Sequence, residues 1–446
     1  MWYIIAFLAL LFVGLMDGHL SSLVAMLFIL LLGGLSIQTI KNKEYKGHGG
    51  KVLGIVFTVY IISAFIASRS FLNGQSFYVG DPLKYLAGYS NINIWSWDEA
   101  LEVITQTVFF FSDDNGLYNQ SLAFWSYIAN CYFDGTSVFY MTLFQTLFGV
   151  LTALEIYKIF AYYFIPSRAS KYVCLFAILS LFHVYSVVVI RDIVIAYFYM
   201  LGLRIVIRKP KVSDIFILLL VLLATIGIRL FTGLFFGAFI MFWLYKLLNE
   251  KKYARVKFLL VPIIVLGVVF VGAAFASSVL LESTTHQVEV NDSIYEGQSG
   301  VSSRLRNLPL GVRQIVILFF SQLPLDNLYR FSIASSISNY YIAILVVLFE
   351  IFDFVIFYGL MYYCIFKGFF MKMAFNERWV LIIMLVFLAL TLSSHIDLRR
   401  AMEAVPFIYL FYLLVPETYN HSNWYKTNKR LVAIGALMMM AYSILF

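Results

Sequence analysis

Residues 215–245 read IFILLLVLLATIGIRLFTGLFFGAFIMFWLY, and Arg229 is the only charged residue in this stretch of 31. The apolar residues on either side of Arg229 predict two short membrane helices joined at the arginine. Basic residues flank both ends of the stretch, in the run RKPK at 208–211 and at Lys246. Loops rich in lysine and arginine stay on the cytoplasmic side of a membrane. The stretch therefore predicts a helical hairpin whose tip faces outward.

The rest of the chain repeats this pattern. Its 446 residues are 62% hydrophobic and 13% charged, with a mean hydropathy of +0.87, values that exclude an ordinary soluble domain. Apolar runs alternate between breaks rich in lysine and breaks with isolated arginines. This alternation assigns sixteen of the seventeen lysines to one face and nine of the fifteen arginines to the other. We expect an all-α, polytopic transmembrane helix bundle, a single domain over residues 1–446 with about 12–13 spans.

The predicted spans cover residues 2–16, 20–37, 52–67, 138–160, 173–189, 193–207, 215–228, 230–247, 258–281, 340–366, 379–392 and 401–415, with a marginal thirteenth at 431–446. Two outer regions, 68–135 and 282–338, are the only places left for structure outside the membrane. In the first, 102–111 and 117–132 predict amphipathic helices that lie on the outer surface. In the second, the apolar run 315–323 is too short to span and suits a re-entrant segment.

Arginines at the outer breaks are the first candidates for a binding site. The positive-inside rule disfavours them there, and an ionisable group near bilayer depth is costly. A guanidinium fork suits phosphate and carboxylate groups, so we expect these arginines to converge on one anionic pocket. The candidates for this pocket are Arg191, Arg229 and Arg399 or Arg400, and Arg304 is a further outer arginine that could contact the substrate. The alternative is structural: the arginines snorkel to the interface or pair with Asp192, Asp397 or Asp81.

Two residues are candidates for a proton acceptor. His395 follows an apolar helix, and histidine ordinarily titrates near neutral pH, which suits a general base oriented by Asp397. Its structural alternative is an interfacial histidine bonded to the same aspartate. Asp81 is the rival base or a ligand for a sugar hydroxyl, but equally a turn residue before Pro82. His183, between apolar neighbours in the middle of a predicted helix, is expected to be a satisfied core histidine.

Other features bear on the remaining functional classes. Glu350 and Asp353 lie three apart on a predicted helix and share a face, which favours a proton or cation path in a transporter. The three cysteines lack the spacing of metal ligands, and no nucleotide-binding or calcium-binding loop occurs. We therefore expect no cofactor and no metal. No basic stripe indicates binding of nucleic acid.

Four short motifs follow one another along the chain. They are GDPLKY at residues 80–85, GLYN at 116–119, SVVVIRDIVIA at 186–196 and DLRR at 397–400. In this order they resemble bacterial polysaccharide polymerases of the EpsG/Wzy type, the O-antigen polymerase-like proteins. The resemblance covers about residues 75–415. Two departures are clear: the family commonly has Arg-Gln where this chain has Arg191-Asp192, and a histidine where this chain offers Arg229.

The resemblance implies a metal-independent membrane glycosyltransferase of GT-C-like fold, multi-pass in the bacterial cytoplasmic (inner) membrane, with helical outer-face loops. Its reaction would polymerise undecaprenyl-diphosphate-linked oligosaccharide repeat units into O-antigen, capsule or exopolysaccharide on the outer face. Membrane lipids and a chain-length regulator are the further partners. The residues implied are Arg191, Arg229, Arg399 and Arg400 for the diphosphate, Arg304, Tyr85 and Asp397 for other substrate contacts, and His395 or Asp81 for catalysis. The alternatives are a lipid-linked oligosaccharide flippase or other transporter, and a membrane acyltransferase with His183 as its candidate.

Overall fold

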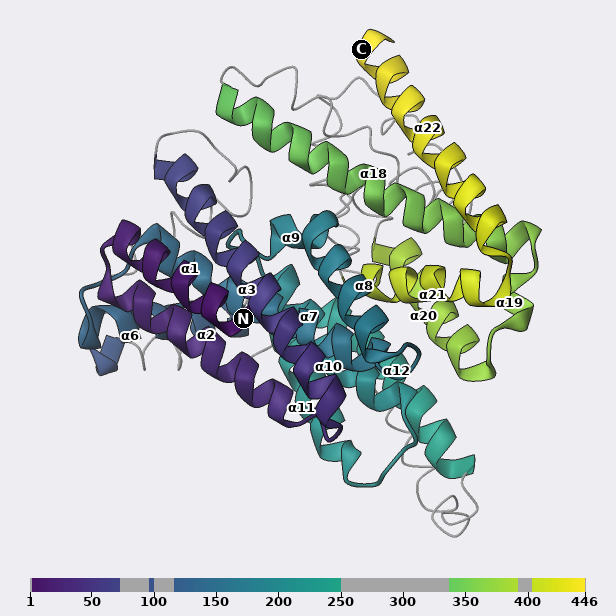
Figure 1. Cartoon of the computed structure of the whole chain (residues 1–446). Coiled ribbons are helices and arrows are strands. Elements are labelled where there is room, and N and C mark those ends of the chain that lie inside the picture. The colour runs from purple at the N-terminus through teal and green to yellow at the C-terminus, as the bar shows by residue number, and fades with distance from the viewer. Residues whose placement is uncertain (1, 73–95, 100–115, 250–336, 392–402, 446) are drawn as a thin grey trace, which may run out of the picture.

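The computed structural model describes residues 2–72, 96–99, 116–249, 337–391 and 403–445, and its regular elements in these ranges are all helices (Figure 1). Four described helices are long and apolar enough to cross a membrane: Leu20–Gln38, Lys43–Arg69, Val138–Phe160 and Leu348–Phe366. Four more are apolar but shorter. The predicted class, an all-α bundle of apolar helices, is therefore confirmed for the described residues. The predicted helix at 102–111, the span at 258–281 and the run at 315–323 lie outside them.

The N-terminal half of the bundle packs around one buried helix. This helix, α7 (Val138–Phe160), has the bounds predicted from hydropathy, and 94% of its most apolar window is buried. It contacts α2 (Leu20–Gln38), α3 (Lys43–Leu72) and α10 (Asp192–Ile207), while α1 (Trp2–Asp17) packs against α3. A helix surrounded on all sides can carry apolar residues all round, and α7 therefore forms the centre of this half.

The break between α2 and α3 is shorter than predicted. The helix α3 begins at Lys43, nine residues before the predicted start, so the lysine-rich run is largely helical. Asn42 explains this start, because its side-chain oxygen accepts a hydrogen bond of 2.9 Å from the backbone N–H of Glu44 and caps the helix. At the other end of α2, Gly18 adopts a φ of 77° and allows the predicted tight turn after α1.

Helix ends that the lysine sorting assigns to the cytoplasmic side meet at one end of the bundle. The Tyr157 hydroxyl, near the end of α7, donates to the carbonyl of Tyr45 in α3 over 2.8 Å. Lys158 donates to the Ser36 hydroxyl, near the end of α2, also over 2.8 Å. We call this the inner end of the bundle.

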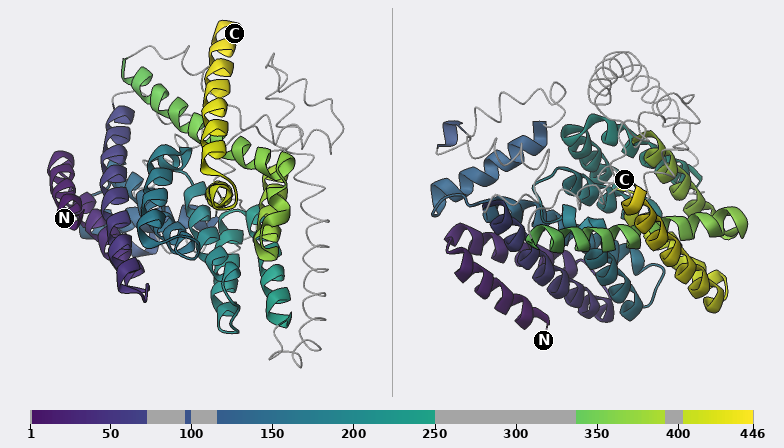
Figure 2. Two further views of the ribbon diagram at one scale, coloured as in Figure 1. Left: turned by 45° about the vertical axis from the view of Figure 1, so that its right-hand side comes forward. Right: turned by 90° about the horizontal axis from the view of Figure 1, so that it is seen from above.

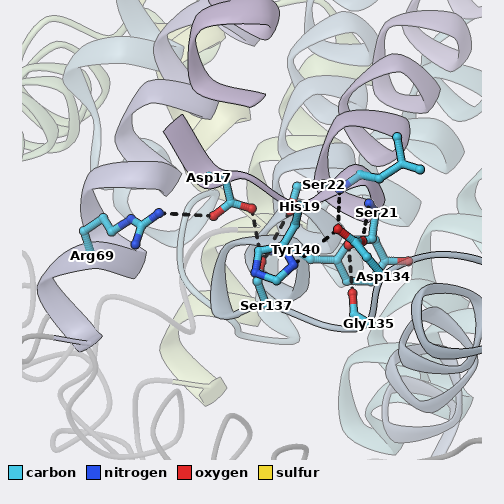
Figure 3. A network of polar contacts seen from close by, with 10 residues as sticks. Asp17, His19, Ser21, Ser22, Arg69, Asp134, Gly135, Ser137 and Tyr140 are labelled. Atoms are coloured by element: carbon cyan, nitrogen blue, oxygen red, sulfur yellow. Dashed lines mark hydrogen bonds and ion pairs between the residues drawn. The ribbon is translucent and has the colours of Figure 1, made fainter. Parts of the chain in front are cut away.

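The opposite, outer end is tied together by the loop before α7 (Figure 3). The Asp134 carboxylate accepts hydrogen bonds from the backbone N–H groups of Leu20 and Ser21, at 2.6 and 2.9 Å, and so caps α2. His19 Nδ1 lies 3.5 Å from the same carboxylate. Burial acts to raise the pKa of Asp134, but the hydrogen bonds from Ser21 and Leu20 outweigh it and hold that pKa below its ordinary value.

A second set of contacts at the outer end joins α1 to α3 and α7. Arg69, near the end of α3, lies 3.7 Å from the Asp17 carboxylate and donates to the Met16 carbonyl over 3.1 Å (Figure 3). Ser137 donates to Asp17 over 3.3 Å and caps α7 by accepting from the backbone N–H of Tyr140. The ends of α1, α3 and α7 are therefore fixed relative to one another.

The prediction of one helix over residues 173–189 is wrong. The structure has α8 (Pro166–Leu179), an extended residue at Ser180, and the short α9 (Leu181–Tyr185). Residues 186–190 are not helical, although they are buried. Two caps begin the new helix α9: the Ser180 hydroxyl accepts from the N–H of Phe182, and the Asp353 carboxylate accepts from the N–H of Leu181 over 3.0 Å. Non-helical backbone at bilayer depth is tolerated where protein buries it.

The predicted hairpin around Arg229 is confirmed as a structural element. Arg229 is the only residue between α11 (Asp214–Ile228) and α12 (Leu230–Asn249), and the two helices pack against each other. Gly233 permits this close approach, because a Cβ there would lie 2.6 Å from the backbone nitrogen of Ile226. The inner end of α10 is capped by Lys246, whose ammonium donates to the carbonyls of residues 206, 207 and 208.

The C-terminal helices form the other side of the bundle. The long α18 (Ile337–Phe366) packs against α21 (Val405–Thr418) and α22 (His421–Leu445). Figure 2 shows α22 crossing α18 and carrying the C-terminus away from the other described helices. The short α19 (Phe369–Lys372) and α20 (Phe375–Thr391) complete this side. The last helix, α22, begins at His421, ten residues before the predicted start at 431. The basic residues Lys426, Lys429 and Arg430, which were expected to lie in a loop, are therefore helical.

The predicted helix at 117–132 is present as α6 (Gly116–Tyr132). It packs against α7 and α11. Trp125 and Tyr140 hold it to α7: their rings stack at a centroid distance of 5.1 Å, and each side chain donates to the other residue's carbonyl, at 3.1 and 2.9 Å.

Candidate functional site

An ion pair joins two helix ends at the outer side of the bundle. Arg229 Nη1 lies 3.0 Å from Asp192 Oδ1, and both side chains are buried. Asp192 is the first residue of α10, where the positive end of the helix dipole stabilises a carboxylate. Arg229 is the single residue between α11 and α12. Burial of either charge alone would be costly, so the pair sets how these three helices meet.

Three more residues complete this site. Tyr199, seven residues after Asp192 and therefore on the same face of α10, donates its hydroxyl to the Thr232 carbonyl. Both Arg229 and Glu403 act on Tyr199 electrostatically. Glu403 is fully buried and immediately precedes the N-terminal turn of α21. We call Asp192, Tyr199, Arg229, Thr232 and Glu403 the outer ionic cluster.

The structure shows where two of the predicted site residues, Arg229 and Arg191, lie. Arg229 is paired with Asp192, which was the structural alternative for this arginine. Arg191 is the N-cap residue of α10, next to Asp192 and half-buried. The other predicted site residues lie outside the described residues: Asp81, Tyr85, Arg304, His395, Asp397, Arg399 and Arg400.

Sequence reasoning missed Tyr199, Thr232 and Glu403. For Glu403 the sequence did hold a signal, because this acid follows the DLRR motif by three residues and interrupts an apolar run. For Tyr199, only its spacing from Asp192 pointed to the site. The hydrogen bond of Thr232 goes through its backbone carbonyl, which no residue pattern reveals.

A second buried ion group lies at the inner side, between α7 and α10. Glu155 Oε1 accepts from Lys158 Nζ at 2.6 Å, and Glu155 Oε2 lies 2.7 Å from Arg204 Nε. The Glu155 and Lys158 side chains are only 4% and 8% exposed. We call these three residues the inner ionic cluster. It was not predicted, because Lys158 served only as a marker of the cytoplasmic side.

The remaining titratable candidates have structural contacts. The expectation for His183 is confirmed: its two ring nitrogens lie 3.1 Å from the Ile178 carbonyl and 2.9 Å from the Ser63 hydroxyl. Asp353, predicted to share a face with Glu350, caps α9 from α18. Both acids are buried.

In the described part of the chain, no three His, Cys, Asp or Glu side chains are grouped so that they could hold a metal ion. Comparison of the chain with protein-family models, with curated proteins and with solved structures finds no match.

The outer ionic cluster places one arginine between two helix ends, paired with Asp192 and adjoined by Arg191, while Glu403 acts on the neighbouring Tyr199. Arg229 is held away from water by the cluster, and an arginine in such a setting interacts more strongly with an anion than one at the surface.

Proposed function

We propose that this chain is a metal-independent glycosyltransferase of the bacterial cytoplasmic membrane. It polymerises undecaprenyl-diphosphate-linked oligosaccharide repeat units into surface polysaccharide on the outer face. One observation supports the proposal: the ends of α10 and α11 bring Asp192 and Arg229 together in a buried ion pair, and Glu403, just before α21, acts on the adjacent Tyr199. The motif DLRR, at 397–400, ends three residues before Glu403 along the chain.

The cluster suits a diphosphate leaving group. When the bond between the anomeric carbon and the diphosphate breaks, negative charge develops on the departing oxygen, and guanidinium groups stabilise it. Asp192 fixes the position of Arg229, so the arginine needs no reorganisation during the step. In this proposal Arg191, Arg399 and Arg400 supply the remaining positive charge, and Arg304, Tyr85 and Asp397 make further contacts with the substrate.

The other half of the reaction needs a proton acceptor. An acceptor sugar hydroxyl attacks the anomeric carbon, and His395 takes its proton, with Asp81 as the rival base. The lipid tail lies against apolar helix faces. One such face runs along α11 toward Arg229 and exposes Phe216, Leu220 and Leu223.

The direct test is deletion of the gene, followed by analysis of the surface polysaccharide and its lipid-linked precursors. Loss of polymer, with single repeat units on the outer face of the membrane, supports polymerisation. Polymer of normal length in the deletion strain would refute it.

The same strain separates the polymerase from a flippase. Loss of a flippase leaves lipid-linked repeat units on the cytoplasmic face, whereas loss of a polymerase leaves them on the outer face. The buried acids Glu350 and Asp353 are the features that favour transport. Asp353 accepts a hydrogen bond from the backbone N–H of Leu181, so this acid has a structural role that needs no transport path. This contact therefore favours the polymerase over the flippase.

A further inference from the structure

Ser63 on α3 and His183 on α9 form a hydroxyl–imidazole pair at the break between α8 and α9. Ser63 Oγ lies 2.9 Å from His183 Nε2, and His183 Nδ1 lies 3.1 Å from the carbonyl oxygen of Ile178. A carbonyl oxygen can only accept, so Nδ1 carries the proton and Nε2 presents its lone pair to the Ser63 hydroxyl. This is the arrangement of a serine nucleophile with its general base.

The end of α8 supplies the third part of such a site. Ile178 lies in the last turn of α8, where the carbonyl groups carry the negative end of the helix dipole. Transfer of a proton from serine to His183 creates an imidazolium, and this negative end stabilises it. The imidazole is also held in place by rings, with Tyr60 stacked at a centroid distance of 5.1 Å and Phe349 at 5.5 Å. The carbonyl and the helix end thus orient His183 as a carboxylate does in a catalytic triad.

The pair is less deeply buried than the residues beside it. Ser63 and His183 are both half-buried, whereas their neighbours Ala64 and Phe182 are fully buried. Ser63 follows Ile62 on α3, whose side chain is 41% exposed. In a membrane bundle an exposed isoleucine faces lipid, so a reactant reaches Ser63 laterally from the bilayer.

We propose that Ser63 and His183 form an acyl-transfer site that takes an oxygen ester of a membrane lipid, independently of the polysaccharide function. Ser63 Oγ attacks the ester carbonyl carbon while His183 Nε2 accepts the hydroxyl proton. The tetrahedral intermediate expels the lipid alkoxide, which takes that proton and leaves as an alcohol, and the acyl group stays on Ser63. An acceptor hydroxyl then attacks the acyl-serine carbonyl carbon while His183 Nε2 accepts its proton, and the second tetrahedral intermediate expels Ser63 Oγ, which takes this proton back from His183 as the new ester leaves.

The test uses the purified full-length protein in detergent and a long-chain alkyl fluorophosphonate, which reacts with activated serines by loss of fluoride. Peptide mass spectrometry should find the alkylphosphonyl group on Ser63. Ser63→Ala should remove it, and His183→Asn should slow labelling about 100-fold or more, the usual contribution of a general base. Asparagine keeps an N–H for the Ile178 carbonyl, and thermal unfolding checks that the variant is folded.

Ser68→Ala is the matched control. Ser68 lies on the same helix, is buried, and donates to the Phe65 carbonyl over 2.7 Å, without a histidine partner. Its removal should leave labelling of Ser63 unchanged. A wild-type protein that is not labelled at Ser63, or labelling of His183→Asn at the wild-type rate, would overturn the proposal.

Discussion

The inner and outer ionic clusters both centre on a buried carboxylate, but they differ in where their charged residues lie along the helices. In the inner cluster, Lys158 and Arg204 lie in the last turns of α7 and α10 and Glu155 lies one turn earlier in α7, and each Glu155 carboxylate oxygen faces one cation. In the outer cluster, Asp192 and Arg229 lie at helix ends, and a second carboxylate, Glu403, lies nearby. The inner charges are all carried by helical residues, whereas Arg229 of the outer cluster lies between two helices.

This difference separates structure from function. A buried ion pair set in intact helices fixes the register of those helices, and removal of one partner leaves an uncompensated charge. A buried cluster at helix ends is instead typical of ligand sites in membrane proteins. We therefore propose that the inner cluster serves stability and that the outer cluster binds the substrate diphosphate.

The largest effect on stability is expected from Glu155→Ala. This change leaves Lys158 and Arg204 buried without their carboxylate and should lower the free energy of unfolding by about 3–5 kcal/mol. Thermal unfolding in detergent measures it. The matched control is Glu417→Ala, which removes an exposed pair with Arg168 at 3.1 Å and should cost less than about 1 kcal/mol. Equal losses would mean that the inner cluster is not structural.

The second-largest effect on stability is expected in α10, the helix that carries residues of both clusters. A Cβ at Gly202 would collide with the buried ring of Phe236 on α12, so Gly202→Ala should destabilise by about 1–3 kcal/mol. Gly237→Ala is the control, because a Cβ there meets nothing within 4 Å and alanine favours a helix. Stability unchanged by Gly202→Ala would show that α10 and α12 pack less closely than described. The double variant with Phe236→Leu should recover part of the loss.

A smaller effect is expected at the outer end, from Asp134. Its folded pKa is held below the ordinary value, so its contribution is present above the unfolded pKa of about 4 and is lost as the pH falls through the folded value. Asp134→Asn should cost about 1 kcal/mol near neutral pH, as loss of a helix cap does. In unfolding curves measured between pH 7 and pH 3, the difference in stability between the wild type and Asp134→Asn should shrink as the pH falls. A constant gap would contradict the role of the carboxylate.

The sidedness of the two clusters can be tested without a change in stability. Cysteines introduced at Asn42, between α2 and α3, and at Ser90, in the first outer region, should differ in reaction with a membrane-impermeant thiol reagent on intact cells. We expect Ser90→Cys to be labelled and Asn42→Cys to be protected, because lysines mark the cytoplasmic side. Labelling of Asn42→Cys would invert the assignment of inner and outer.

The sequence was enough for most helices but not for the breaks that depend on distant residues. Apolar length and flanking charge predicted α7 to the residue and the hairpin at Arg229. The end of α8 could not be predicted, because the cap on Leu181 comes from Asp353, 172 residues away. Likewise, Glu155 and Arg204 meet only after α7 and α10 pack, whereas the pairing of Arg229 with Asp192 was one of the alternatives that the charges allowed.

One comparison tests the central claim most directly: polymer made by Arg229→Lys and by Arg204→Lys in the deletion strain. Both changes keep the charge and remove the guanidinium fork from an arginine that is paired with a buried carboxylate. At equal amounts of membrane-inserted protein, Arg229→Lys should lower polymer formation about 100-fold, as loss of a charge-stabilising group does, while Arg204→Lys keeps it near normal. Near-normal polymer from Arg229→Lys, or an equal loss from both, would contradict the account.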